Sequence, residues 1–285
     1  MRGTFDAIRG GTTLRGRVLR ILLIFTIVQL IVAALVSARS KAAARRRELL
    51  RPRTYPSIEF PTIDAEGDVD DLQLYMRADR LSDDIVAAID AAEHYVYAET
   101  YIWIDDASGM RIVEALARAV ERGVKCVVIF DWLQSSKNME QRLRSVGVTC
   151  FAFRPITGRD ALRPSNLLRD HRKVLVADGT TGFLGGYNFG DEFLAWRDTH
   201  VRITGKTVRE LENAFVDFWN QQRPLHLGPL PRAEKRSWDP GAFVHRNDPS
   251  LAIFPIRGIY IEAIDRASKQ IWITNAYFVP DRAIR

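Results

Sequence analysis

Residues 169–193, RDHRKVLVADGTTGFLGGYNFGDEF, decide the fold of this chain. Two apolar runs, Val174–Ala177 and Gly182–Leu184, flank the turn-forming residues Asp178-Gly179-Thr180. Apolar runs separated by a short turn of this composition are typical of a β-hairpin. The sequence therefore predicts two antiparallel strands joined by a tight turn.

The hairpin places polar groups on one face. Side chains alternate along a strand, so His171 and Lys173 are expected on the same side of the sheet. If Gly179 and Thr180 form a two-residue turn, His171 lies opposite Asn188 and Lys173 lies opposite Gly186. Directly opposed residues are about 5 Å apart, so these groups would form one small surface.

That surface suits a phosphoryl centre. An imidazole such as that of His171 can attack phosphorus and form a covalent intermediate. Lys173 and Asn188 could hold the phosphate oxygens as charge redistributes, and the glycine pair Gly185-Gly186 would let backbone N–H groups approach the phosphate. A hairpin with one histidine and one lysine on its solvent face is also an ordinary surface, so spacing by itself leaves both interpretations open.

The pattern His171-x-Lys173-x4-Asp178-x6-Gly185-Gly186-x-Asn188 resembles the signature of the phospholipase D superfamily. The sequence around this motif is most similar to that of the bacterial cardiolipin synthase branch, including the run Trp196-Arg-Asp198-Thr-His-Val201. The resemblance covers residues 72–222 as a complete first half and residues 258–285 as the beginning of a second half. It implies an α/β sandwich with a mixed sheet and a site built from two such halves.

The resemblance also implies roles for individual residues. His171 would be the nucleophile that gives a phosphohistidine, and a histidine of the partner half would protonate the leaving oxygen. By analogy with triad logic, Asp198 is a candidate for fixing the His171 tautomer; a surface carboxylate paired with Arg197 is the alternative. Asp178 is a signature residue, but an Asp-Gly turn favours aspartate in any case, so a structural role is at least as well supported.

Aromatic residues accompany these groups. Trp196, Tyr187 and Phe193 could line an acyl or glycerol pocket, although buried aromatic side chains more often simply pack.

Strands and helices alternate on either side of the hairpin. The patterns predict a strand at 72–76, a helix following Ser82, a strand at 95–103, a helix following Ser108, a strand at 124–130, a helix at 138–145 and strands at 148–153 and 201–203. Thr207 and Glu210 form a capping-box pattern that opens a further helix. This alternation predicts an α/β fold with a mixed sheet flanked by helices.

The composition excludes some classes of site. The chain has 285 residues, a net charge of +6 and two cysteines, Cys126 and Cys150, both in predicted buried strands. The cysteines and the five histidines show no metal-ligand spacing, so no metal, disulfide framework or cofactor is expected. A modest positive charge fits an anionic membrane surface or nucleic acid equally well.

The N-terminal segment is apolar from Ile21 to Val36 except for Thr26 and Gln29, and residues 19–38 extend it to about the length that crosses a bilayer. A cleaved signal peptide would need a small-residue exit, whereas arginines and lysine follow at once, and a buried helix is disfavoured by arginine-rich flanks. A membrane anchor fits best. Seven basic residues follow the span and five precede it, which favours a cytoplasmic catalytic part.

The predicted organisation is therefore a basic N-terminus with the anchor (1–53), a linker (54–71), the first catalytic half (72–223), a proline-rich connector (224–257) and the incomplete start of a second half (258–285). The repeat of Ala88-Ile-Asp-Ala-Ala92 in Ala263-Ile-Asp-Arg-Ala267 supports the second half. No second H-x-K follows residue 173.

The leading hypothesis is a membrane-anchored phosphatidyltransferase that resembles cardiolipin synthase and acts on phosphatidylglycerol, with a second copy or a second half completing the site. The alternatives are a phospholipase D-type phosphodiesterase, a homodimeric nuclease, or an inactive half-enzyme. A cell-membrane location is expected, and nucleic acid is the less favoured partner.

Overall fold

The computed structural model describes residues 21–29, 31–32, 71–157, 166, 168–232, 244–247, 254–275, 278 and 280. The chain divides into two units, one made of Met1–Glu59 with Arg257–Arg285 and the other of Phe60–Ile256. Within the described residues, the strands and the helices between residues 78 and 222 lie in the second unit, where the predicted site is located.

The second unit is built on one seven-stranded sheet in the order β1-β7-β6-β5-β2-β3-β4. Its strands are β1 (Leu72–Tyr75), β2 (Tyr95–Thr100), β3 (Lys125–Asp131), β4 (Thr149–Phe153), β5 (Val174–Ala177), β6 (Thr181–Gly185) and β7 (His200–Thr204). Strands β2, β3 and β4 pair in parallel, whereas β5, β6, β7 and β1 add antiparallel pairs. The predicted mixed sheet is confirmed.

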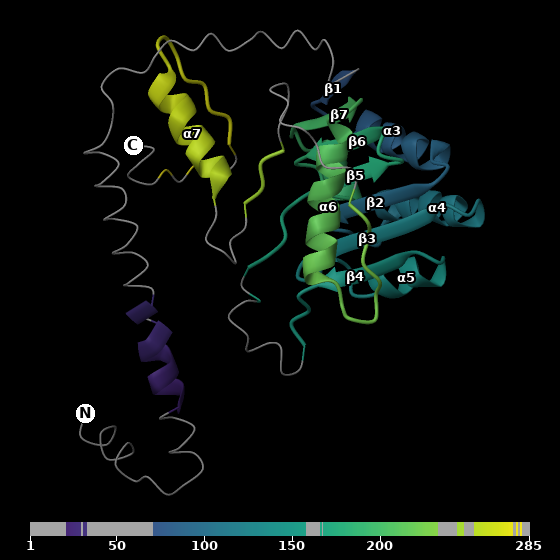
Figure 1. Ribbon diagram of the computed structural model, residues 1–285, viewed down its shortest axis with the longest axis horizontal. Helices are drawn as coiled ribbons and strands as arrows, with labels where there is room; N and C mark the ends of the chain where they lie inside the picture. Colours follow the sequence, from purple (N-terminus) through teal and green to yellow (C-terminus); the bar gives the residue numbers. More distant parts are fainter. Residues whose placement is uncertain are drawn as a thin grey trace, which may run out of the picture. The chain divides into compact units, whose positions relative to one another are not determined.

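Helices cover both faces of the sheet (Figure 1). Helices α3 (Ala78–Ala91), α4 (Ala107–Glu121) and α5 (Met139–Ser145) lie on one side, and α6 (Val208–Gln222) lies on the other. The largest core cluster joins the apolar faces of α3 and α4 to one side of the strands, and two smaller clusters join α6 to the opposite side. Burial on both faces explains the nearly continuous apolar strand β3.

Helix starts differ from the predicted ones. Helix α3 begins at Ala78, ahead of the predicted Ser82, and α4 is capped by the Asp106 side chain, which accepts a hydrogen bond from Gly109 N at 3.0 Å. At α6, Thr207 already has helical dihedral angles (φ −62°, ψ −24°), and the capping box predicted there is not formed between these described residues. A side-chain cap needs an extended N-cap backbone, which Asp106 has and Thr207 lacks.

The hairpin of β5 and β6 is confirmed, but its register is one residue away from the predicted one. Val174 pairs with Leu184 and Ala177 with Thr181, so three residues lie between the strands. Asp178 (φ 52°) and Gly179 (φ 64°) both adopt the left-handed region, and Thr180 N donates to Ala177 O at 3.1 Å. Lys173 is consequently aligned with Gly185 rather than Gly186.

The N-terminal segment is described only in part. Residues 21–29 and 31–32 are helical with exposed side chains, and the rest of the predicted span 19–38 lies outside the described residues. Within the part of the chain that the structure describes, no helix combines the length and the apolar character that crossing a bilayer requires. The predicted linker 54–71 also lies outside the described residues except for Asp71.

Helix α7 (Pro255–Arg266) starts in the predicted connector and continues into the predicted start of the second half. None of its residues is buried, and Trp272 beyond it is 88% exposed. The boundaries predicted at 224–257 and 258–285 stay predictions.

Candidate active site

The first element of the site is the segment that enters β5. His171 and Lys173 point the same way, as predicted: Lys173 Nζ lies 3.3 Å from His171 Nδ1 and donates a hydrogen bond to the His171 carbonyl oxygen at 2.8 Å. The Tyr101 ring, which follows β2, packs against the imidazole with the ring centroids 4.5 Å apart. The structure thus brings an imidazole and an ammonium together at the end of the sheet where β5 begins.

Burial shapes the charge of this pair. The Lys173 side chain is buried, which lowers its pKa to about 8, while neighbouring carboxylates, led by Asp170 and Asp198, act in the opposite direction. His171 is exposed on one side, but its partial burial and then the Lys173 charge lower its pKa below the usual value. The imidazole is therefore neutral at neutral pH, as a nitrogen nucleophile has to be.

A buried carboxylate at the end of β3 holds the chain just ahead of His171. Asp131 is fully buried, and its Oδ1 accepts hydrogen bonds from Arg169 Nε at 3.0 Å and from Leu133 N at 2.9 Å. Its Oδ2 accepts from Asp170 N at 3.0 Å. Sequence reasoning missed this residue; the signal was an acid closing an otherwise apolar strand.

A second polar cluster lies close enough to Lys173 to act on its charge. Arg172 Nε donates to Asp170 Oδ1 at 3.1 Å, and Arg172 Nη2 approaches Glu99 Oε1 at 2.5 Å as a charge contact that lacks hydrogen-bond geometry. The guanidinium also stacks over the Phe218 ring of α6. Burial, and then the Asp170 charge, raise the pKa of Glu99 well above its usual value. Sequence reasoning also missed Glu99, because it lies within a predicted strand and no motif marks it.

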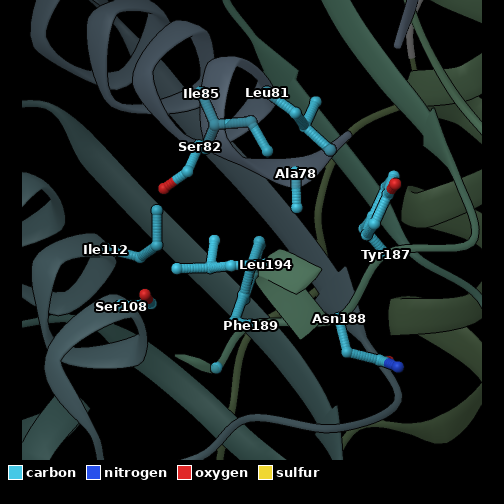
Figure 2. A pocket seen from close by; sticks show the side chains of 11 residues that line it. Ala78, Leu81, Ser82, Ile85, Ser108, Ile112, Tyr187, Asn188, Phe189 and Leu194 are labelled. Atoms are coloured by element: carbon cyan, nitrogen blue, oxygen red, sulfur yellow. The ribbon is translucent and has the colours of Figure 1, made fainter. Parts of the chain in front are cut away.

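Asn188 sits beside this surface. Its Oδ1 accepts a hydrogen bond from Ile102 N at 3.1 Å, next to the Tyr101 ring that packs on His171. Figure 2 shows the Asn188 amide directed away from the apolar side chains of the neighbouring pocket. The amide oxygen accepts this backbone bond, and the NH₂ group, which is the donor end of the amide, can donate to an anion.

The glycine pair is placed differently from the prediction. The N–H groups of Gly185 and Gly186 donate to the carbonyl oxygens of Lys173 and Thr199, at 3.3 and 2.9 Å, so both are engaged in the sheet rather than turned to a phosphate. A Cβ on Gly185 would lie 2.5 Å from the His200 Cα, and a Cβ on Gly186 would lie 2.3 Å from both carboxylate oxygens of Asp198. Glycine is needed here for close packing.

Asp178 lies at the far end of β5 from Lys173. Its carboxylate accepts three backbone hydrogen bonds, from Glu93, His94 and Tyr95, at 2.8 to 2.9 Å. Although partial burial raises its pKa, these bonds outweigh that effect and lower the pKa below the usual value. Of the two roles considered for Asp178, the geometry supports the structural one, because the residue ties the hairpin turn to β2.

Asp198 is close to the pair but does not hold the ring directly in this structure. Its Oδ1 accepts from Thr199 N at 2.7 Å, while His171 Nδ1 faces Lys173. The carboxylate nonetheless acts on both groups electrostatically. Its negative charge partly offsets the lowering of the pKa values of Lys173 and His171.

The aromatic candidates separate into two kinds. Tyr187 and Phe193 are buried in the main core, whereas Trp196 is 54% exposed. The apolar pocket in Figure 2 is lined by Tyr187 among residues of α3, α4 and the 3-10 helix at 191–195.

Known proteins are similar to this chain over a large part of its length. Residues 85–219 match the family model described as "Cardiolipin synthase, PLD-like domain". A cardiolipin synthase of Halalkalibacterium halodurans is 33% identical over 216 residues, covering 70% of this chain and 42% of the relative. A cardiolipin synthase A of Pseudomonas entomophila is 35% identical over 215 residues, covering 70% and 44%. This chain thus spans less than half the length of these relatives.

Among solved structures similar to this chain, two are 20% identical to it in sequence. The phospholipase D family member Nuc from Salmonella typhimurium has a TM-score of 0.43 and covers 54% of this chain and 96% of its own. A phosphatidylserine synthase from Haemophilus influenzae has a TM-score of 0.43 and covers 58% of this chain and 41% of its own.

The signature around His171 and the family match define the class: the chain belongs to the phospholipase D superfamily. Within that superfamily its PLD-like domain is of the cardiolipin synthase type.

Proposed function

We propose that this chain provides the first half of a phosphatidyltransferase that joins two phosphatidylglycerol molecules into cardiolipin and releases glycerol. The observation that carries the proposal is the contact of Lys173 with His171, which pairs a neutral imidazole with a buried ammonium. The names of the relatives, cardiolipin synthases, supply the substrate class.

His171 is the proposed nucleophile. In the free site the ammonium, which can only donate, faces Nδ1, so the neutral ring carries its proton on Nε2. A bound phosphate offers Lys173 other acceptors and releases Nδ1. Once the proton has moved from Nε2 to Nδ1 through solvent, Asp198 can accept a hydrogen bond from Nδ1–H. The Nε2 lone pair then attacks phosphorus as the P–O bond to the leaving glycerol breaks, giving the phosphohistidine.

The remaining groups manage charge on the phosphate. Lys173 and the NH₂ group of Asn188 donate to the non-bridging oxygens as negative charge redistributes. The backbone amides of Gly185 and Gly186 have no part in this proposal, because they bond within the sheet. Such a site works with protein donors and needs no cofactor.

A second half has to complete the site. The general acid that protonates the leaving glycerol oxygen is proposed to be a histidine of a second PLD-like half, supplied by another copy or by a separate polypeptide segment. The motif at residues 171–188 occurs once here, and the relatives are more than twice as long as the matched region. We therefore expect weak or no turnover by residues 1–285 alone.

The proposed location is the cell membrane, with residues 19–38 as a single-pass anchor and the catalytic part on the cytoplasmic side. The apolar run and the excess of basic residues that follow it support this topology. An anchor would keep the site beside its lipid substrate.

The test supplies labelled phosphatidylglycerol to the full chain and follows products by thin-layer chromatography and acid-labile label on the protein. We expect slow labelling of the protein that His171→Ala abolishes, while His226→Ala, which alters an exposed histidine after α6, retains it. Label on the His171→Ala chain contradicts the assignment. Phosphatidic acid as the product would indicate a phosphodiesterase, and nicking of plasmid DNA would indicate a nuclease.

A further inference from the structure

The hydroxyl of Tyr187 bridges two points of the chain near the site. Tyr187 lies between the glycine pair and Asn188, and its side chain is 4% exposed. Its Oη donates to the Trp196 carbonyl oxygen at 2.9 Å and accepts from Asp198 N at 2.9 Å. A phenol has one proton and free lone pairs, so it can make both bonds at once.

The bridged segment has little other regular structure. It leaves the 3-10 helix Asp191–Ala195 at Trp196 and enters β7 at His200. Between them, Thr199 N donates to the Asp198 carboxylate at 2.7 Å, and Gly186 N donates to Thr199 O at 2.9 Å. The carboxylate of Asp198 therefore packs on Gly186, in the space that a Cβ would fill.

The position of Asp198 matters to the site because its negative charge favours the ammonium form of Lys173. Several other charged or titratable groups also face Lys173: Asp170, Asp131, Glu99, His171 and His200. Asp170 and Asp131 are held by Arg172 and Arg169. Asp198 is instead held by the backbone N–H of Thr199 at its carboxylate and by the Tyr187 hydroxyl at its own backbone N–H.

We propose that Tyr187 is a positioning residue whose hydroxyl holds Asp198 against Gly186 and so keeps the Asp198 carboxylate at the Lys173–His171 pair. The inference deepens the proposed function, since that function gives Lys173 and His171 their roles. The ring of Tyr187 packs in the core as a phenylalanine ring would, so the hydroxyl is the part that serves the site.

The variant Tyr187→Phe removes the hydroxyl and keeps the ring. In the full chain labelled with ¹³C at lysine Cε, we follow the Lys173 resonance with pH, assigning it by its loss in Lys173→Met. We expect the pKa of Lys173 to fall by roughly 0.5–1 below its wild-type value in Tyr187→Phe, as an ammonium loses a nearby opposite charge. Asp198→Asn, which removes that charge directly, sets the largest shift.

The matched control is Tyr95→Phe. The Tyr95 hydroxyl likewise has a hydrogen-bond partner, the Glu212 side chain, but it lies by the hairpin turn at the other end of β5. This variant loses a partly buried hydroxyl contact and should leave the Lys173 titration unchanged, so a general loosening of the fold can be told apart from a displaced Asp198.

An unchanged Lys173 titration in folded Tyr187→Phe overturns the inference. So does an unchanged titration in Asp198→Asn, an outcome that stays informative if Tyr187→Phe does not fold. The titration uses no substrate, so its result is independent of whether the chain transfers phosphatidyl groups. If the labelling assay shows no activity but the Lys173 pKa shifts in Tyr187→Phe, the proposed function is refuted and the positioning role of Tyr187 stands.

Discussion

The ammonium of Lys173 lies 3.3 Å from Nδ1 of His171 and is fixed there by its 2.8 Å hydrogen bond to the His171 carbonyl oxygen. The two residues are adjacent on one face of the sheet, and one is buried while the other is exposed. Burial first, and then the nearby Lys173 charge, lower the pKa of His171 and so disfavour its protonated form. The contact also ties the state of His171 to that of Lys173.

Replacement of Lys173 by methionine should raise the pKa of His171. Burial lowers that pKa first and the Lys173 charge lowers it further. Removing the charge leaves burial alone to oppose the neighbouring carboxylates, which raise the pKa. Titration of the imidazole carbon-bound protons by NMR measures the change, which we expect to be about 0.5–1. A pKa that falls would show that the ammonium is not beside the ring in solution.

Gly185→Ala should destabilise the fold. The new Cβ would lie 2.5 Å from the His200 Cα and from the Thr199 carbonyl oxygen, and backbone atoms of a central strand cannot move aside cheaply. We expect a loss of about 2–3 kcal/mol in the free energy of unfolding, measured with urea. Gly228→Ala is the matched control, because a Cβ there meets nothing within 4 Å; equal losses in the two variants would contradict the packing role.

Asp178→Ala should cost stability without altering the site. It removes an ionised acceptor of three backbone N–H groups and places alanine at a positive φ of 52°. The expected loss is about 3 kcal/mol by urea unfolding. Asp178→Asn keeps an acceptor oxygen and tolerates this backbone, so it should lose less. A normal stability of Asp178→Ala with a changed Lys173 titration would instead support a chemical role.

His200 should make the fold sensitive to acid. Burial, and then the Lys173 charge, lower its pKa to about 3, whereas an unfolded histidine titrates near 6.5. The unfolded state therefore binds the extra proton between these values, and stability falls as the pH drops from about 6.5 towards 3, by up to about 1.4 kcal/mol per pH unit.

The measurement compares urea unfolding at pH 7 and pH 5 in the wild type and in His200→Gln. The substituted chain should lose less stability between the two pH values. His226→Gln, at an exposed position, serves as the control and should keep the wild-type difference. If His200→Gln shows the full wild-type loss, protonation of His200 is not the cause.

Much of the fold was predictable from local pattern. The apolar runs around Asp178-Gly179 specify a hairpin because turn residues and period-2 burial act over short distances. The continuous apolar strand β3 and the helices beside it indicate a sheet covered on both faces, which the structure confirms. The register was predicted one residue away, because Asp178 joins Gly179 and Thr180 as a third residue between the paired strands.

Other features depend on residues that are distant in sequence. Asp131 reaches Arg169 across 38 positions, and Asp178 reaches Glu93 across 85. A carboxylate in a turn or at the end of a strand looks alike whether it binds a substrate or a backbone amide. The hydrogen-bond partner of such a carboxylate is set by which distant strands pair in the sheet.

The sequence by itself determined the hairpin, the family signature and the pairing of His171 with Lys173, because each follows from spacing within a short segment. It also determined the mixed α/β class, because strand and helix patterns alternate along residues 72–222. The tertiary structure decided which polar residues serve the fold and which face the site. It turned the Gly185 and Gly186 amides into the sheet, assigned Asp178 to the turn, and set Asp198 under the Tyr187 hydroxyl. The physical reason is that hydrogen-bond partners and burial are settled by long-range strand pairing, which no local pattern records.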